Sequence, residues 1–210
     1  MTDIVNHSLQ GFLDELASKQ ATPGGGSVAA LLGAQAAALV SMVCNLTLGK
    51  VKYAAVTEDM QVLLRDAEQL RADLTAMITE DVAVFNQLMA CYALAKTTDA
   101  EKQHRAEQIQ LALTQATEAP LKCVTACYHA LQLAYIAAEK GNLGAISDAG
   151  VAAVAALAGL KSAALNVKIN ATALNDREYA DAKLAEIQNF LNLGELQAEK
   201  TYQLVNSKLQ

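Results

Sequence analysis

Aromatic residues are scarce in this 210-residue sequence, where they make up 4% of the total and tryptophan does not occur. Proline occurs only twice, and no long segment alternates apolar with polar residues or clusters β-branched residues as strands do. These absences exclude most β architectures and predict an all-α protein. Because alanine is abundant and large rings are rare, we expect the helices to pack closely against one another.

An excess of positive charge is also lacking. The chain has 16 Lys and Arg residues against 22 Asp and Glu residues, which gives a formal net charge of −6. Proteins whose main partner is a nucleic acid usually carry a clustered basic patch, whereas the basic residues here are scattered. We therefore expect no nucleic-acid partner.

Cysteine and histidine are present but form no recognised metal-binding pattern. Cys123 and Cys127 are one helical turn apart, yet no CxxC or HxxxH motif accompanies them. The three histidines are isolated from one another. The sequence predicts no metal site, and we interpret the four cysteines as small buried apolar residues.

No membrane-directing segment is evident. The first ten residues, MTDIVNHSLQ, are polar and unlike a signal peptide, so we expect a cytoplasmic protein with reduced thiols. The apolar run over residues 28–48 has about the length of a membrane span, but it contains Gln35, Ser41 and Asn45 and lacks flanking aromatic residues. We interpret it as a buried helix and expect no membrane partner.

The most distinctive stretch spans residues 22–48 and opens with the consecutive glycines Gly24, Gly25 and Gly26. Ser27 follows and is predicted to be the N-cap of a helix that ends near the last residue of the stretch. Glycine allows another group to approach the backbone closely, and the start of a helix presents unpaired N–H groups. The loop is therefore a candidate binding element, with a simple tight turn into a buried helix as the alternative.

Helix-boundary signals predict a single domain over residues 1–210, with about seven helices and long central ones. No linker or internal repeat divides the chain. The predicted helices cover residues 8–18, 27–48, 57–95, 100–118, 120–140, 147–173 and 176–206. Pro120 is expected either to kink the fourth helix or to open the fifth. Faces rich in small residues predict a helical dimer interface, and hence a homodimer.

One apolar stripe with a seven-residue period runs along the helix predicted over 57–95. Its only charged member is Asp81, and its members are Leu63, Ala67, Leu70, Leu74, Met77, Asp81, Val84, Leu88 and Cys91. A carboxylate in an apolar seam is costly unless it is paired or neutralised. Asp81 is therefore a candidate site residue, with a structural carboxylate satisfied by a neighbouring group as the alternative.

A second stripe, on the helix predicted over 147–173, consists of small and polar residues. It comprises Asp148, Ala152, Ala155, Gly159, Ser162 and Asn166. Small residues let another backbone or a flat ligand come close, which makes Asp148 a second candidate. Its alternative is an ordinary first-turn aspartate that interacts with the helix dipole. Asn166 and Asn170 lie one turn apart and can present their amides together.

Three blocks of the sequence together resemble the cyclodeaminase/cyclohydrolase family of folate enzymes. They are TPGGGSVAALLGAQAAALVSMVCNLTLGK (22–50), EDVAVFNQLMACYALAK (80–96) and the segment 141–170, which begins GNLGAISDAGVAA. The family includes the cyclodeaminase domain of formiminotransferase-cyclodeaminase and free-standing methenyltetrahydrofolate cyclohydrolases. The resemblance covers nearly the whole chain. The family's Leu-Pro-Lys appears here as Leu94-Ala95-Lys96, so the lysine is kept and the proline is lost.

The resemblance implies an all-helical dimer that binds folate near the glycine loop and at the subunit interface. It implies catalytic roles for Asp81 and Asp148 as acid/base groups, although one of them could instead bind the pterin ring. The implied substrate-binding residues are Gly24, Gly25, Gly26, Ser27, Lys50, Lys52, Tyr53, Lys96, Asn166 and Asn170. The lysines would hold the glutamate tail of the folate, and the two asparagines would orient the substrate. Neither a metal nor a cofactor beyond the tetrahydrofolate substrate is expected.

Two reactions at the N5/N10 bridge of tetrahydrofolate remain open. Cyclohydrolysis opens methenyltetrahydrofolate to 10-formyltetrahydrofolate, and cyclodeamination closes formiminotetrahydrofolate with loss of ammonia. Because no formiminotransferase segment accompanies the chain, we expect the cyclohydrolase. The alternative from another class is a non-catalytic helical dimerisation module, for which Asp81 and Asp148 would be dispensable.

Overall fold

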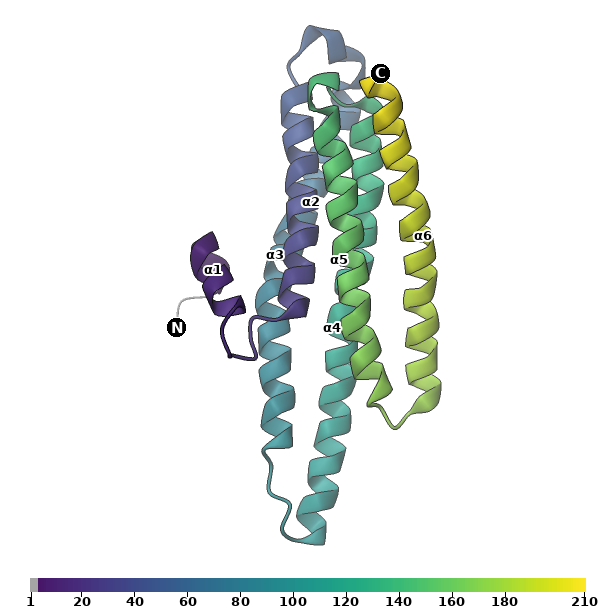
Figure 1. Ribbon diagram of the computed structural model, residues 1–210. Helices are drawn as coiled ribbons and strands as arrows, with labels where there is room; N and C mark the ends of the chain where they lie inside the picture. Colours follow the sequence, from purple (N-terminus) through teal and green to yellow (C-terminus); the bar gives the residue numbers. More distant parts are fainter. Residues whose placement is uncertain (1–3) are drawn as a thin grey trace.

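The computed structural model describes residues 4–210, which form an elongated bundle of helices (Figure 1). No strand occurs in this part of the chain, which confirms the all-α prediction. Residues 4–210 contain six α-helices rather than about seven. They are α1 (Leu9–Leu16), α2 (Gly25–Thr47), α3 (Thr57–Tyr92), α4 (Asp99–Lys140), α5 (Ile146–Thr172) and α6 (Arg177–Leu209). Short 3-10 turns lie at η1 (Ile4–Asn6), η2 (Val51–Val56) and η3 (Leu143–Ala145).

The helix count differs because Pro120 does not divide α4 into two helices. Proline has no N–H, so Pro120 cannot donate to the carbonyl of Ala116, four residues earlier. In the structure the side-chain amide of Asn170, on α5, donates to this carbonyl at 2.5 Å. The bond between helices satisfies the carbonyl that Pro120 leaves free. Helix α4 therefore continues through the proline and is 42 residues long in total.

The end of α3 also differs from its predicted position, because the helix stops at Tyr92 rather than near residue 95. Arg105, on α4, donates from Nε and Nη2 to the carbonyl oxygen of Tyr92 at 3.2 and 3.1 Å. A cation at this position satisfies an end carbonyl and interacts favourably with the helix dipole. Lys96 therefore lies in the turn between α3 and α4 and not at a helix end.

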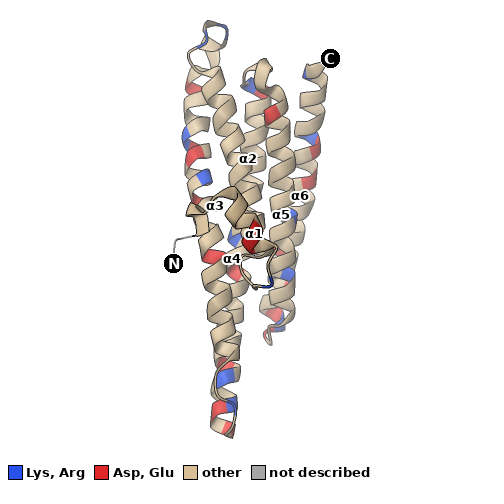
Figure 2. Ribbon diagram, turned by 60° about the vertical axis from the view of Figure 1, so that its left-hand side comes forward, with Lys and Arg blue, Asp and Glu red and all other residues tan. Residues whose placement is uncertain are grey.

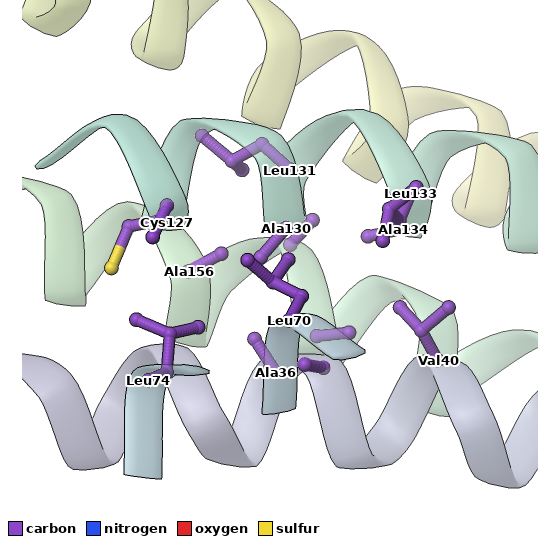
Figure 3. Packing of buried hydrophobic residues seen from close by; sticks show 14 of the residues in the cluster. Ala36, Val40, Leu70, Leu74, Cys127, Ala130, Leu131, Leu133, Ala134 and Ala156 are labelled. Carbon is purple, nitrogen blue, oxygen red and sulfur yellow. The ribbon is translucent and has the colours of Figure 1, made fainter. Parts of the chain in front are cut away.

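The core is built from small residues that bring α2, α4 and α5 close together. A Cβ atom at Gly159 would lie 2.9 Å from both the carbonyl oxygen of Ala29 and the Sγ of Cys127. Figure 3 shows alanines of α2, α4 and α5 packed beside larger side chains of α3, including Leu70 and Leu74. The small-residue stripe of α5 thus lies along α2. The interpretation of the cysteines as buried residues is confirmed for Cys44, Cys123 and Cys127, whereas Cys91 is only partly buried.

Two segments are long and apolar enough to span a membrane, namely α2 and Leu143–Thr172. Within the bundle, 61% and 50% of their most apolar windows are buried. Core helices of soluble proteins have the same length and composition. The burial of these segments agrees with their interpretation as helices that pack against other helices.

Candidate active site

The N-terminus of α2 meets a carboxylate from the middle of α3. The hydroxyl of Ser27 donates to Oδ2 of Asp81 at 2.7 Å. A Cβ atom at Gly26 would overlap the carboxylate of Asp81, so only glycine at this position allows the close contact. Asp81 is half-buried and forms no ion pair with a Lys or Arg within residues 4–210.

The predicted N-cap role of Ser27 is wrong, because α2 begins two residues earlier, at Gly25. Gly24 is the N-cap and supplies no side-chain acceptor. The first N–H groups of a helix have no acceptor within the helix, and its N-terminus carries a partial positive charge. The carboxylate of Asp81 therefore lies where negative charge is favoured, although it comes from another helix.

A small, partly open cavity of about 20 Å³, roughly the space of one water molecule, lies beside this contact. Helices α2, α3, α4 and α5 all contribute to its wall, which includes Gly26, Met77, Asp81, Pro120 and Cys123. The wall is mostly apolar, and Asp81 and Glu80 are its charged members within the described chain. Glu80 is engaged by Lys122 at 3.2 Å, so Asp81 is the carboxylate that is free of an ion pair.

The two asparagines of the predicted site have different surroundings. Asn166 lies beside the glycine loop, since a Cβ atom at Gly25 would lie 3.8 Å from its Nδ2. Asn170 uses its amide to donate to the carbonyl of Ala116. We refer to Gly24–Ser27, Asp81 and Asn166 as the Asp81 cluster. Substrate contacts by Asn166 and Asn170 stay predictions.

A second group of predicted residues gathers where α2 ends and α5 begins. The hydroxyl of Tyr53 donates to Oδ1 of Asn142 at 3.3 Å and accepts from the N–H of Leu143 at 3.0 Å. This turn leads directly into the first turn of α5, which contains Asp148. Lys52, on the adjoining η2 segment, and Lys50, the residue before it, are both exposed. We call Lys50, Lys52, Tyr53 and Asp148 the Asp148 end.

One chain does not bring the Asp81 cluster and the Asp148 end together. Asp148 and Asn166 lie on the same helix and are separated by about 27 Å at a rise of 1.5 Å per residue. Lys96 is remote from Lys50 and Lys52, because the whole of α3, about 54 Å long, lies between their turns. Figure 1 shows these two turns at opposite ends of the bundle.

Sequence reasoning missed a polar cluster between α4 and α6. The hydroxyl of Tyr179 donates to Glu118, and Nζ of Lys183 lies 2.9 Å from the same carboxylate. Partial burial and the bond to Glu118 raise the pKa of Tyr179 to about 12. Partial burial opposes ionisation of Glu118, but hydrogen bonds from Tyr179 and Lys183 outweigh it and lower the pKa of that carboxyl. No local sequence signal could have revealed contacts between residues so far apart in the chain.

No group of three or more His, Cys, Asp or Glu side chains among residues 4–210 is arranged to hold a metal ion. The chemistry available at the Asp81 cluster is that of a carboxylate beside an apolar cavity and a helix N-terminus. Such a group can accept a proton from water or bind the N–H groups of a ligand.

Comparison with known proteins relates this arrangement to folate enzymes. The family model for formiminotransferase-cyclodeaminase matches residues 8–189. A protein of Methylorubrum extorquens named methenyltetrahydrofolate cyclohydrolase is 51% identical over 97% of this chain and 98% of its own length. A Mus musculus protein named formimidoyltransferase-cyclodeaminase is 34% identical over 93% of this chain, which spans only 36% of that longer protein.

A solved structure agrees with these matches. The crystal structure of formiminotetrahydrofolate cyclodeaminase from Thermotoga maritima superposes with a TM-score of 0.80 and 29% identity, and covers 97% of this chain and 96% of its own. Sequence and fold thus agree over almost the whole length. The chain therefore belongs to the formiminotransferase-cyclodeaminase family, whose members include both cyclodeaminases and cyclohydrolases.

Proposed function

We propose that the protein is a methenyltetrahydrofolate cyclohydrolase. The observation that carries this proposal is the 51% identity to a protein of that name along nearly the full length of both chains. The cyclodeaminase relatives described above are less similar, at 34% and 29% identity. The relation to a solved cyclodeaminase nevertheless makes formiminotetrahydrofolate cyclodeaminase activity the second candidate.

Cyclohydrolysis requires proton transfers at one carbon atom. Water adds to the methenyl carbon between N5 and N10, and one water proton passes to a base. The resulting tetrahedral carbon then loses its bond to N5, which takes up the second proton, while the oxygen becomes the formyl carbonyl. The products are 10-formyltetrahydrofolate and one proton, so general acid/base groups suffice.

Asp81 and Asp148 are the proposed acid/base carboxylates for these steps; the alternative is that one of them acts as the acid/base group while the other binds the pterin ring. Asp81 lies beside a cavity and next to the glycine loop, which supports its contact with the substrate. The backbone of Gly24–Ser27 contacts the folate, and Asn166 orients it from the same side. Tetrahydrofolate is the substrate carrier, and no metal or further cofactor takes part.

We expect a homodimer because α2 and α5 together expose an apolar face. On α5, Val151, Val154, Leu165 and Ile169 share one side of the helix, and each is more than half exposed. The neighbouring α2 contains no charged residue and exposes Met42. Figure 2 shows charge spread along α3 and α6, whereas α2 is free of it. An apolar face of this kind is typical of a surface that is covered by a partner.

A two-fold axis across this face would complete the site. The midpoint between Asp148 and Asn166 is the middle of α5, and α2 runs antiparallel beside it. If two copies pack antiparallel about that point, the Asp148 end of one copy faces the Asp81 cluster of the other. The two groups, about 27 Å apart within one chain, would then meet across the two copies. Two equivalent sites, each shared by both copies, would result.

Turnover assays separate the candidate reactions. Purified protein is mixed with methenyltetrahydrofolate or with formiminotetrahydrofolate, and ultraviolet absorbance follows the methenyl bridge. We expect loss of the bridge from methenyltetrahydrofolate. Formation of the bridge from the formimino compound alone would show a cyclodeaminase, and inactivity towards both would favour the non-catalytic dimerisation module. As a soluble cytoplasmic enzyme, the protein should need neither membranes nor nucleic acid for activity.

Mixed dimers test whether the site is shared. Asp81→Asn and Asp148→Asn proteins should each be inactive, but their heterodimer contains one site with both native carboxylates. Random pairing makes about half of the dimers mixed, so about one quarter of wild-type activity should return. As the control, Asp81→Asn is paired with the double variant, which has no native pair to form. Mixed dimers without regained activity would contradict a shared site.

A further inference from the structure

The hydroxyl of Ser27 differs from those of the buried threonines in the described chain. Thr47, Thr117 and Thr201 are buried in helices and each donates to the carbonyl four residues earlier in its own helix. Ser27 is also completely buried, but it donates across to α3, to the carboxylate of Asp81. Its bond therefore joins two helices at the wall of the cavity.

Ser27 itself has no access to a ligand through its side chain. Its exposed fraction is 0%, and it is absent from the cavity wall, to which Gly26 and Asp81 both contribute. Its hydroxyl can donate one hydrogen bond, and Oδ2 of Asp81 accepts that bond at 2.7 Å. The side chain thus touches the candidate catalytic carboxylate and not the space where a substrate would bind.

Two contacts restrict the carboxylate of Asp81. The bond from Ser27 holds Oδ2, and the missing Cβ of Gly26 leaves the space that the carboxylate occupies. A bond to an ionised acceptor is short and strong compared with one between neutral groups. With one oxygen held, the plane of the carboxylate and the position of Oδ1 are fixed relative to the cavity.

We infer that the side chain of Ser27 has a positioning role: it holds the carboxylate of Asp81 in the orientation that turnover requires and, unlike the backbone of the loop, does not contact the substrate. The inference rests on the proposed function, because Asp81 must act on the folate for its orientation to matter. It gives the serine of the Gly-Gly-Gly-Ser stretch a task different from that of the glycines, which admit the carboxylate and the ligand.

Ser27→Ala is a test that removes only the hydroxyl. The variant should lose about 10- to 100-fold in turnover, the range typical of a displaced catalytic group. It should change the same kinetic parameter, kcat or KM, that Asp81→Asn changes, and to a smaller extent. Ser27→Thr, which keeps the hydroxyl, should recover most of the activity.

Ser41→Ala is the matched control, because Ser41 is a buried serine on the same helix, about 21 Å further along it. Its activity should stay within about twofold of the wild type, since it lies far from the carboxylate. If Ser41→Ala lowers turnover as much as Ser27→Ala does, general loss of packing explains both and the inference is wrong.

A double-mutant cycle distinguishes positioning from independent effects on the fold. Ser27→Ala should lower both the turnover and the denaturation midpoint less in the Asp81→Ala background than in the wild type. Equal effects in both backgrounds would overturn the inference. Full activity of Ser27→Ala in an active enzyme would overturn it while leaving the proposed function intact. An inactive wild-type protein would instead overturn the proposed function and, with it, this inference.

Discussion

Replacing Asn170 by alanine should destabilise α4 at the point where Pro120 interrupts its hydrogen bonds. The carbonyl of Ala116 has no backbone donor four residues later and depends on the Asn170 amide at 2.5 Å. Ala116 itself is buried, with an exposed fraction of 5%. A buried polar group that loses its partner costs about 1–3 kcal/mol, so Asn170→Ala should lower the free energy of unfolding by that amount.

The same substitution should cost much less when position 120 carries alanine. Pro120→Ala returns an N–H to the helix, and the Ala116 carbonyl then regains its ordinary donor. We expect Asn170→Ala to cost less than about 1 kcal/mol in that background. The difference between the two backgrounds, about 1–2 kcal/mol, is the coupling between Asn170 and Pro120.

Urea denaturation of the wild type, the two single variants and the double variant measures this coupling. The control is Asn192→Ala, which removes an exposed asparagine of α6 that accepts a hydrogen bond from Gln188. Equal losses from Asn170→Ala in both backgrounds would refute the idea that the amide compensates for the proline. Steady-state kinetics on the same proteins test whether Asn170 also orients the substrate, as predicted from the sequence, in addition to its structural bond to the Ala116 carbonyl. If Asn170 orients the substrate, KM should also rise when the fold is kept by Pro120→Ala.

Four further predictions concern the packing and the site. Gly26→Ala should be less stable than Gly25→Ala by about 1–3 kcal/mol, because only the former displaces Asp81; equal denaturation midpoints would contradict this. Gly25→Val should weaken folate binding, measured by titration, with the helical circular dichroism unchanged; unaltered affinity would reduce the loop to a turn. Gly159→Ala should lower the free energy of unfolding by about 1–3 kcal/mol, because its Cβ meets backbone of α2. Folding raises the pKa of Tyr179 from 10.0 to about 12, so the folded state keeps the phenol proton to higher pH than the unfolded state does, and the free energy of unfolding should fall as pH rises between these values. Tyr179→Phe should remove this fall, together with the tyrosinate absorbance that appears near pH 12.

Much of the fold followed from the sequence because helix patterns are local. The seven-residue stripe of α3 correctly predicted the burial of Leu63, Leu70 and Leu74. The side chains of Thr98 and Glu101 form a capping box at the start of α4, a signal that four consecutive residues are enough to encode. The predicted helix boundaries were wrong where a side chain distant in the sequence determines the local structure. The sequence left open whether Pro120 kinks a helix or opens a new one, because the amide that allows the helix to continue comes from 50 residues further along the chain.

The candidate site could be predicted residue by residue but not as an arrangement. Asp81 was found because a charge in an apolar stripe needs an explanation, and the structure provides one in Ser27 and the start of α2. Asp148 was found on a stripe of small residues, which proves to border α2. Periodicity says which residues share a face, yet it gives no distance between two different helices, so the separation of the two carboxylates stayed hidden.

The start of α2 explains why the local interpretation of the glycine stretch was incomplete. A serine after a loop is usually the cap of the helix that follows, because its hydroxyl reaches the next N–H groups. Here glycine lets the helix begin two residues earlier, so Ser27 falls inside the first turn and its hydroxyl faces α3. A carboxylate 54 residues away then lies at the helix N-terminus, where its negative charge is favoured. The absence of side chains at the loop therefore does more than free the backbone: it admits Asp81 to the end of α2 and leaves that carboxylate beside the cavity.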